Sequence, residues 1–139
     1  MAVVVMATIV PAAVIGQHVA QCAAADAEAL AAILDAGQSL VFFPEGTLSR
    51  EPGLQPFRMG AFVLAARADV PLLPVALGGT RMVLRDGQWF PHRGEVRVDL
   101  CGHLLADGHE WLDAIKLRDK ARAVLLQRLD EPDRLRLAS

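Results

Sequence analysis

The sequence predicts an α/β fold in which a mostly parallel sheet is flanked by helices, and three observations support this prediction. A helix-forming stretch precedes a short apolar run, and a loop, a second helical pattern and a second apolar run follow. A strand–helix–strand crossover of this kind places its two strands parallel in one sheet. With 139 residues, of which 53% are hydrophobic, the chain is long enough for one domain with its own core.

Three segments make up the first part of this pattern. Residues 24–36 (AADAEALAAILDA) have high helix propensity, and Gly37 follows as a C-terminal stop. Residues 39–43 (SLVFF) form a continuous apolar run, which is typical of a fully buried strand. Residues 44–56 contain three prolines and two glycines, so they predict a loop.

The second part begins with a helical pattern at residues 57–68. Apolar side chains at helical spacing predict one packed face: Phe57, Ala61, Leu64, Ala65 and Ala68. The apolar run at residues 70–77 contains two prolines, and because proline cannot donate to a β-ladder, we expect an edge strand or an interrupted one. Residues 95–100 (EVRVDL) alternate like a half-buried strand. Residues 109–129 predict a C-terminal helix with an apolar component: Ile115, Leu117, Val124, Leu125 and Leu129.

The first sixteen residues (MAVVVMATIVPAAVIG) are apolar. They are fewer than the roughly 20 residues that span a bilayer, and they lack the basic start of a signal peptide. We expect a buried strand or strand-like segment here, with a monotopic membrane contact as a further role. A truncated gene start would give the same pattern.

Charge and cysteine content argue against several classes of protein. The net charge is −2 and the pI about 6.0, which gives no reason to expect nucleic acid as a partner. Cys22 and Cys101 are too few and too far apart for a disulfide framework or a CxxC metal pair. A reduced cytoplasmic compartment is therefore expected.

A cluster of polar residues follows the first predicted strand. The stretch VFFPEGTLSR contains Glu45, Gly46, Thr47, Ser49 and Arg50, and ligands of open α/β sheets bind at the carboxyl ends of strands. Hydroxyls, a carboxylate and a guanidinium suit a ligand that carries both hydroxyl and phosphate groups, and the glycine lets the backbone approach it closely. An ordinary polar loop is the alternative interpretation.

FPEGT at residues 43–47 is followed by SR, then by PF and GA, and VPLLPVAL occupies residues 70–77, with GTR after it. In this order and at this spacing, the motifs resemble the third and fourth conserved blocks of the glycerol-phosphate and lysophosphatidate acyltransferase family. The resemblance covers about residues 26–105. It looks closest to bacterial acyltransferase domains, including those found fused to acyl-activating enzymes.

The resemblance implies an enzyme that moves a fatty acyl group from acyl-CoA or an acyl carrier to the hydroxyl of a lysophosphatidate-like glycerolipid in phospholipid biosynthesis, with no further cofactor. It implies that Glu45 and Gly46, with Thr47 beside them, bind the glycerol-phosphate part of the acceptor. The family often has Arg after the Thr, where this chain has Leu48. Arg50 either takes over the phosphate contact or is a solvated loop cation.

The resemblance also implies a location for the protein. Because the acceptor and the product of such a reaction are membrane lipids, we expect a cytoplasmic protein that is peripheral at the inner membrane face. The apolar N-terminus and the surface of the helix at residues 57–68 are the candidate membrane contacts.

The family's catalytic histidine lies in an H-x-x-x-x-D block, whose Asp orients the His that takes the hydroxyl proton. The residues five positions after the four histidines are Ala23, Arg97, Gly108 and Ala114, so the block is absent and the catalytic residues are unknown. We expect residues 1–139 to form a single, N-terminally truncated acyltransferase-like domain whose missing half comes from a fusion or partner chain. A non-catalytic lipid- or acyl-binding remnant, or an α/β domain whose loop matches by chance, are the alternatives.

Three further arrangements involve histidine. His18 could approach the FPEGT loop with Asp26 as a distant partner, although a structural histidine is the simpler interpretation. His109 and Asp113 would share a helix face as a surface pair. A last cluster consists of side chains that can bind metals, namely Cys101, His103, Asp107 and His109. Their spacing matches no standard zinc pattern, so we predict no metal site there.

Overall fold

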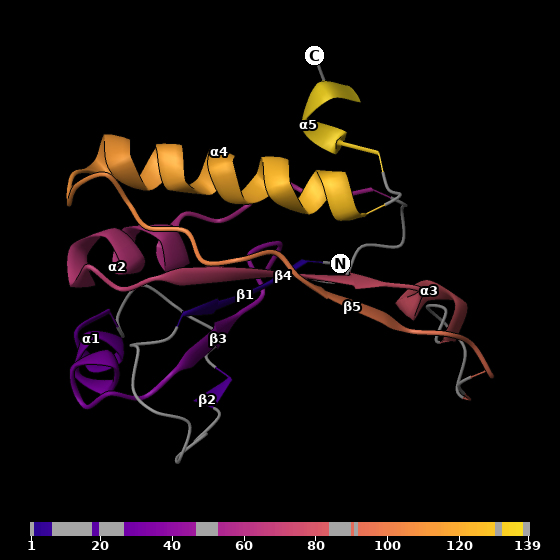
Figure 1. Cartoon of the computed structure of the whole chain (residues 1–139), viewed down its shortest axis with the longest axis horizontal. Helices are drawn as coiled ribbons and strands as arrows, with labels where there is room; N and C mark the ends of the chain where they lie inside the picture. Colours follow the sequence, from indigo (N-terminus) through magenta and orange to yellow (C-terminus); the bar gives the residue numbers. More distant parts are fainter. Residues whose placement is uncertain are drawn as a thin grey trace.

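The computed structural model describes residues 2–6, 18–19, 27–46, 53–83, 90, 92–129 and 132–137. Its strands are β1 (Ala2–Met6), β2 (His18–Val19), β3 (Leu40–Phe42), β4 (Leu72–Gly78) and β5 (Arg97–Leu100). Its helices are α1 (Ala27–Asp35), α2 (Gly60–Ala68), α3 (Thr80–Val83), α4 (Trp111–Arg128) and α5 (Arg134–Leu137). Helices α2 and α4 pack against each other over the sheet, where α2 contacts β1 and α4 contacts β4 (Figure 1). The α/β class is therefore confirmed.

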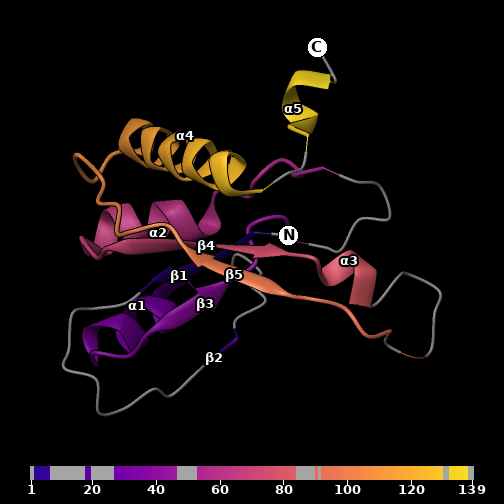
Figure 2. The same ribbon diagram turned by 45° about the vertical axis from the view of Figure 1, so that its right-hand side comes forward.

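The five strands form one sheet in the order β2-β3-β1-β4-β5 (Figure 2). β2 and β3 are parallel, but β1 is antiparallel to both β3 and β4, and β4 is antiparallel to β5. The prediction of a mostly parallel sheet is therefore wrong. β3 and β4 do run in the same direction, as the crossover through α2 requires, but β1 lies between them and pairs with both. Residues 2–6 of the predicted N-terminal segment form a strand, which takes the central position, and residues 7–16 lie outside the described residues.

The expectation of an edge or interrupted strand at residues 70–77 is also wrong, because β4 runs unbroken between β1 and β5. Strand β4 can contain Pro74 because the N–H that proline lacks would face the end of β5. In an antiparallel strand the N–H and C=O of one residue point to the same neighbour, and Pro74 O accepts a hydrogen bond from Cys101 N at 2.9 Å, just past the end of β5. Only the reciprocal bond at that last pair is lost.

Strand β5 has the predicted alternation but the opposite orientation. The apolar side chains of β5 are exposed, by 57% at Val98 and 67% at Leu100, as is Val96 just before the strand, by 47%. The polar side faces the helix instead, because Arg97 Nη2 donates to Arg128 O at the end of α4 at 2.5 Å and Arg97 Nε bonds Asp99 at 2.8 Å. Alternation predicts two faces, and the contact of Arg97 with the end of α4 shows which of them is turned toward the helix.

The three longer helices are confirmed with small shifts of their ends. α1 stops as predicted, because Gly37 has a φ of +76° and donates to Leu34 O at 2.9 Å. α2 begins at Gly60, after Phe57, and ends at Ala68, followed by the C-cap residue Asp69 in a left-handed conformation with a φ of 51°. None of the helices in the described ranges is long and apolar enough to cross a membrane.

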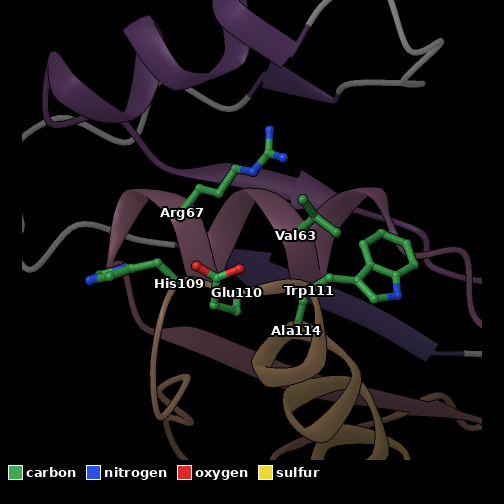
Figure 3. A pocket seen from close by; sticks show the side chains of 6 residues that line it. All are labelled: Val63, Arg67, His109, Glu110, Trp111 and Ala114. Carbon is green, nitrogen blue, oxygen red and sulfur yellow. The ribbon is translucent and has the colours of Figure 1, made fainter.

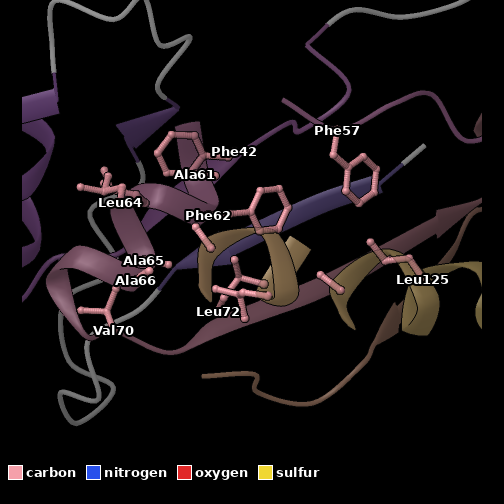
Figure 4. Close-up of a cluster of buried hydrophobic side chains, with 14 of the residues drawn as sticks. Phe42, Phe57, Ala61, Phe62, Leu64, Ala65, Ala66, Val70, Leu72 and Leu125 are labelled. Carbon is pink, nitrogen blue, oxygen red and sulfur yellow. The ribbon is translucent and has the colours of Figure 1, made fainter. Parts of the chain in front are cut away.

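The core lies between the sheet and helices α2 and α4 (Figure 4). Phe62 on α2 is fully buried and its ring stacks on Phe57, with centroids 6.0 Å apart and an interplanar angle of 9°. Leu72 on β4 and Leu117 and Leu125 on α4 are buried with it. Leu129 is buried as well, so three of the five apolar positions predicted for the C-terminal helix belong to this core.

Candidate functional site

A tight turn follows β3 at the place where FPEGT predicts a site. Gly46 N donates to Phe43 O at 2.9 Å, which closes a four-residue turn with Pro44 and Glu45 at its centre. Gly46 has a φ of +73°, in the left-handed region that favours glycine. Pro44 is buried, whereas Glu45 is partly exposed. The turn therefore presents the Glu45 carboxylate at the end of a sheet strand.

Arg58 lies directly against this turn and was not among the predicted site residues. Its N–H donates to Pro44 O at 2.8 Å, and a Cβ at position 46 would lie 2.8 Å from Cδ and Cζ of Arg58, and closer still to Nε. The positive φ favours glycine at position 46, and the exposed Arg58 side chain would have to move aside for any larger residue there. Arg58 is exposed, and no hydrogen bond or ion pair joins its guanidinium to another described residue.

The backbone of a second segment holds the Glu45 carboxylate. Gln55 N donates to Glu45 Oε2 at 3.1 Å. Arg122 on α4 is buried and contacts the same segment, because its Nη2 donates to Leu54 O at 2.7 Å and its Nη1 to Gln55 O at 2.6 Å. The surroundings of Glu45 are therefore built from three distant parts of the chain.

The structure places only some of the other predicted residues. Thr47, Ser49 and Arg50 lie outside the described residues, so their predicted contacts stay predictions. His18 lies in β2, where its Cα pairs with that of Leu40 at the start of β3, whereas the turn follows the end of β3. The structure thus brings together Glu45, Gly46 and the unpredicted Arg58.

A sequence model of the family described as Acyltransferase matches residues 5–78 of this chain. The chain belongs to the acyltransferase family. The part that matches the acyltransferase family includes β3, the turn, α2 and β4, and with them Glu45, Gly46 and Arg58. Helix α4 and Arg122 lie outside it.

Individual acyltransferases are similar over shorter or longer parts of the chain. A 1-acyl-sn-glycerol-3-phosphate acyltransferase of Escherichia coli strain K12 is 32% identical over 96 residues, which are 69% of this chain and 38% of the relative. Chloroplastic enzymes of the same name are 44% identical over 63 residues in Brassica napus and 40% over 67 in Arabidopsis thaliana. Those alignments cover 45% and 48% of this chain and 18% and 19% of the relatives, so the chain spans less than half of each relative's length. No solved structure matches the chain.

His109, which was predicted to form a surface pair with Asp113, contacts helix α2. His109 precedes α4, and its Nδ1 lies 2.8 Å from Ala66 O. Asp113 instead forms an ion pair with Lys116 at 3.0 Å, and the hydrogen bond from Lys116 lowers the pKa of Asp113 below its ordinary value. His109 and Asp113 thus have separate hydrogen-bond partners, although they lie close enough for His109 to act electrostatically on Asp113.

The cluster around Cys101 is separated by other contacts. Asp107 forms an ion pair with Lys120 at 2.9 Å. Burial raises the pKa of the Cys101 thiol, and the charge of Arg128 acts in the opposite direction. Within the described ranges, no three or more His, Cys, Asp and Glu side chains are grouped so that they could hold a metal ion.

A hollow of about 130 Å³ lies between α2 and α4 and is separate from the turn (Figure 3). It is much smaller than the roughly 300–1,000 Å³ of typical small-molecule sites. Glu45, Gly46 and Arg58 are not among its lining residues, which are Val63, Arg67, His109, Glu110, Trp111 and Ala114. The turn therefore remains the candidate site of this acyltransferase-family chain.

Proposed function

We propose that this chain forms the acceptor side of an acyltransferase that acts on a lysophosphatidate-like glycerolipid, with an acyl thioester as donor. The observation that supports the proposal is the turn after β3, which has Glu45 at its centre and the exposed Arg58 side chain against Gly46. A lysophosphatidate carries a phosphate and a free hydroxyl. The turn offers one group suited to each. Relatives that are 1-acyl-sn-glycerol-3-phosphate acyltransferases provide independent support.

In this proposal, Arg58 donates hydrogen bonds to the acceptor phosphate and Glu45 accepts one from a hydroxyl of the glycerol part. Thr47 and Arg50 would add a hydroxyl and a second cation. The acceptor hydroxyl oxygen forms a bond to the thioester carbonyl carbon, the C–S bond breaks, and the hydroxyl proton passes through a base to the departing thiolate. Because none of the four histidines lies in an H-x-x-x-x-D block, we assign the base to a fusion or partner chain.

The same proposal places the protein at the cytoplasmic face of a membrane. Its acceptor and product are lipids, and a peripheral protein reaches them without spanning the bilayer. Co-sedimentation of the chain with vesicles that contain lysophosphatidate would support this location.

The reaction is tested with the purified 139-residue chain. It is incubated with lysophosphatidate and either acyl-CoA or an acyl carrier thioester, and phosphatidate is followed by mass spectrometry against a heat-denatured control. Calorimetric titration with a short-chain lysophosphatidate measures acceptor binding separately. Binding that saturates at one acceptor per chain supports the acceptor site, and the absence of binding contradicts the proposal.

A second candidate function follows from the missing H-x-x-x-x-D block. The chain would bind the lipid without transferring an acyl group, as a non-catalytic subunit or remnant. Acceptor binding without phosphatidate is expected of the chain alone under both functions, because the first takes its base from a fusion or partner chain. Phosphatidate made by the chain alone would exclude the non-catalytic function.

The substitution Arg58→Met is expected to weaken acceptor binding about tenfold. It removes one charge-assisted contact to the phosphate from an exposed site, where water and salt screen the interaction. The difference in acceptor Kd between the wild type and Arg58→Met should become smaller as the salt concentration rises, because salt screens the contact between Arg58 and the phosphate in the wild type. Titrations at low and high salt measure both effects.

Arg67→Met is the matched control for this prediction. Arg67 is also exposed and lies on α2, but in its last turn, away from Gly46. It should bind the acceptor as the wild type does. Equal losses in the two variants would show that net charge, and not the position of Arg58, determines binding.

A further inference from the structure

Arg122 is the one charged side chain that is buried within the described part of the chain, with 5% of its surface exposed. Burial of a cation is costly unless hydrogen bonds and an opposite charge compensate for it. Asp133 supplies the charge, with Oδ1 2.5 Å from Nη2. The Phe57 ring lies 5.0 Å from the guanidinium carbon. Arg122 Nε is buried and has no hydrogen-bond partner among the described residues, so part of the cost of burying this cation is not compensated.

The carbonyl groups that Arg122 contacts lie in the segment that holds Glu45. Arg122 Nη2 donates to Leu54 O at 2.7 Å, and Nη1 donates to Gln55 O at 2.6 Å. The C=O of Leu54 and the N–H of Gln55 belong to one peptide group, and that N–H donates to Glu45 Oε2 at 3.1 Å. A continuous chain of hydrogen bonds therefore runs from Arg122 through one peptide group to the Glu45 carboxylate.

Because the peptide group is planar, the hydrogen bond at its oxygen fixes the direction of the hydrogen bond at its N–H. The peptide is trans, so its C=O and N–H point in opposite directions. Fixing the Leu54 carbonyl on the guanidinium therefore aims the Gln55 N–H at Glu45. A cation at the oxygen also polarises the peptide, which makes its N–H a stronger donor.

We propose that Arg122 is a positioning residue for Glu45, acting through the Leu54–Gln55 peptide group. The inference rests on the proposed role of Glu45 in acceptor binding. Arg122 lies on α4, outside the residues 5–78 that match the family model. An arginine that only anchored Asp133 would not influence binding through Glu45.

A double-mutant cycle separates these two roles. Arg122→Lys keeps the charge but loses the planar fork that bonds both carbonyls. With Glu45 present, it is expected to weaken binding of a short-chain lysophosphatidate about tenfold, the effect of one charge-assisted hydrogen bond. In the Glu45→Ala background, the same change should alter binding by less than about twofold. The exposed residue at the end of the same helix provides the control, Arg128→Lys, which should bind normally in both backgrounds.

An equal loss of binding from Arg122→Lys in the two backgrounds would overturn the proposal, because the effect would then bypass Glu45. The free energy of unfolding, measured by urea denaturation, should fall equally in both backgrounds. Stability and binding thus report different roles of the same residue.

A measurement without ligand tests the role of Arg122 independently of acceptor binding. If the wild type binds no acceptor, that result contradicts the proposed function and leaves this test in place. In proton–nitrogen correlation spectra, Glu45→Ala and Arg122→Lys should both shift the Gln55 amide proton upfield, because each weakens its hydrogen bond. Should Arg122→Lys fail to fold, Asp133→Asn, which removes the carboxylate partner, is expected to move the same resonance in the same direction. An unmoved Gln55 resonance in a folded variant would contradict the role of Arg122.

Discussion

Replacing Glu45 with alanine is expected to weaken binding of a lysophosphatidate-like acceptor by about 10- to 100-fold, the range for one hydrogen bond to a charged group. Its carboxylate is partly exposed at the turn, and Gln55 N holds one of its oxygens. The loss should appear as a higher Kd in calorimetric titration. The fold should remain, since the side chain contributes nothing to the apolar core.

Glu28→Ala is the control for the Glu45 prediction. Glu28 is an exposed acid in the first turn of α1, and its removal changes the net charge by the same amount. It is expected to bind the acceptor normally and to lose at most about 1 kcal/mol of stability through the helix dipole. If Glu45→Ala bound the acceptor as well as Glu28→Ala does, the turn would not be the acceptor site.

The substitution Phe62→Ala is expected to lower the free energy of unfolding by about 3–5 kcal/mol, which is a large part of the stability of a domain this size. Phe62 is fully buried between α2, the sheet and α4, and its ring stacks on Phe57 (Figure 4). Truncation removes apolar burial and leaves a cavity. Urea denaturation followed by circular dichroism measures the change.

The neighbouring residue provides the control for Phe62. Val63 is partly exposed and lines the hollow between α2 and α4 (Figure 3). Val63→Ala should cost no more than about 1 kcal/mol. Comparable losses from both variants would mean that the α2–sheet contact is not the centre of the core.

The helices could be predicted from sequence because their signals are local. Spacing of apolar side chains identified α2, and Gly37 marked the end of α1, where it adopts the positive φ that a C-terminal stop requires. The strand at residues 39–43 was predicted equally well, because a short apolar run between turn residues needs no partner to be recognised.

The sheet could not be predicted in the same way, because strand pairing is a property of distant segments. No local feature of residues 2–6 indicates that they pair with both β3 and β4. The proline rule failed at Pro74 because it depends on which neighbour its backbone faces. Which face of β5 is turned toward the helices depended on the end of α4, where Arg128 O accepts a hydrogen bond from the Arg97 side chain.

The residues of the candidate site show the same difference between local and distant signals. Glu45 and Gly46 were found because they lie within one motif that follows a strand. Arg58 lies twelve residues after Gly46 in the sequence, and only the fold brings its side chain against that glycine. Gln55 acts through its backbone, which no side-chain pattern reveals, and nothing local in the sequence separates Arg122 from the other cations of the C-terminal helix.

The central position of β1 has a consequence for the order of folding. The β3–α2–β4 unit, which could close on its own if its strands were neighbours, must instead leave a gap one strand wide. The contacts that fill this gap join residue 2 to residue 76, and contacts of such sequence separation form slowly. Until β1 docks, β3 and β4 each expose an edge that can pair with another molecule. The turn that carries Glu45 leaves directly from β3, so it should become ordered only when the first strand of the chain arrives.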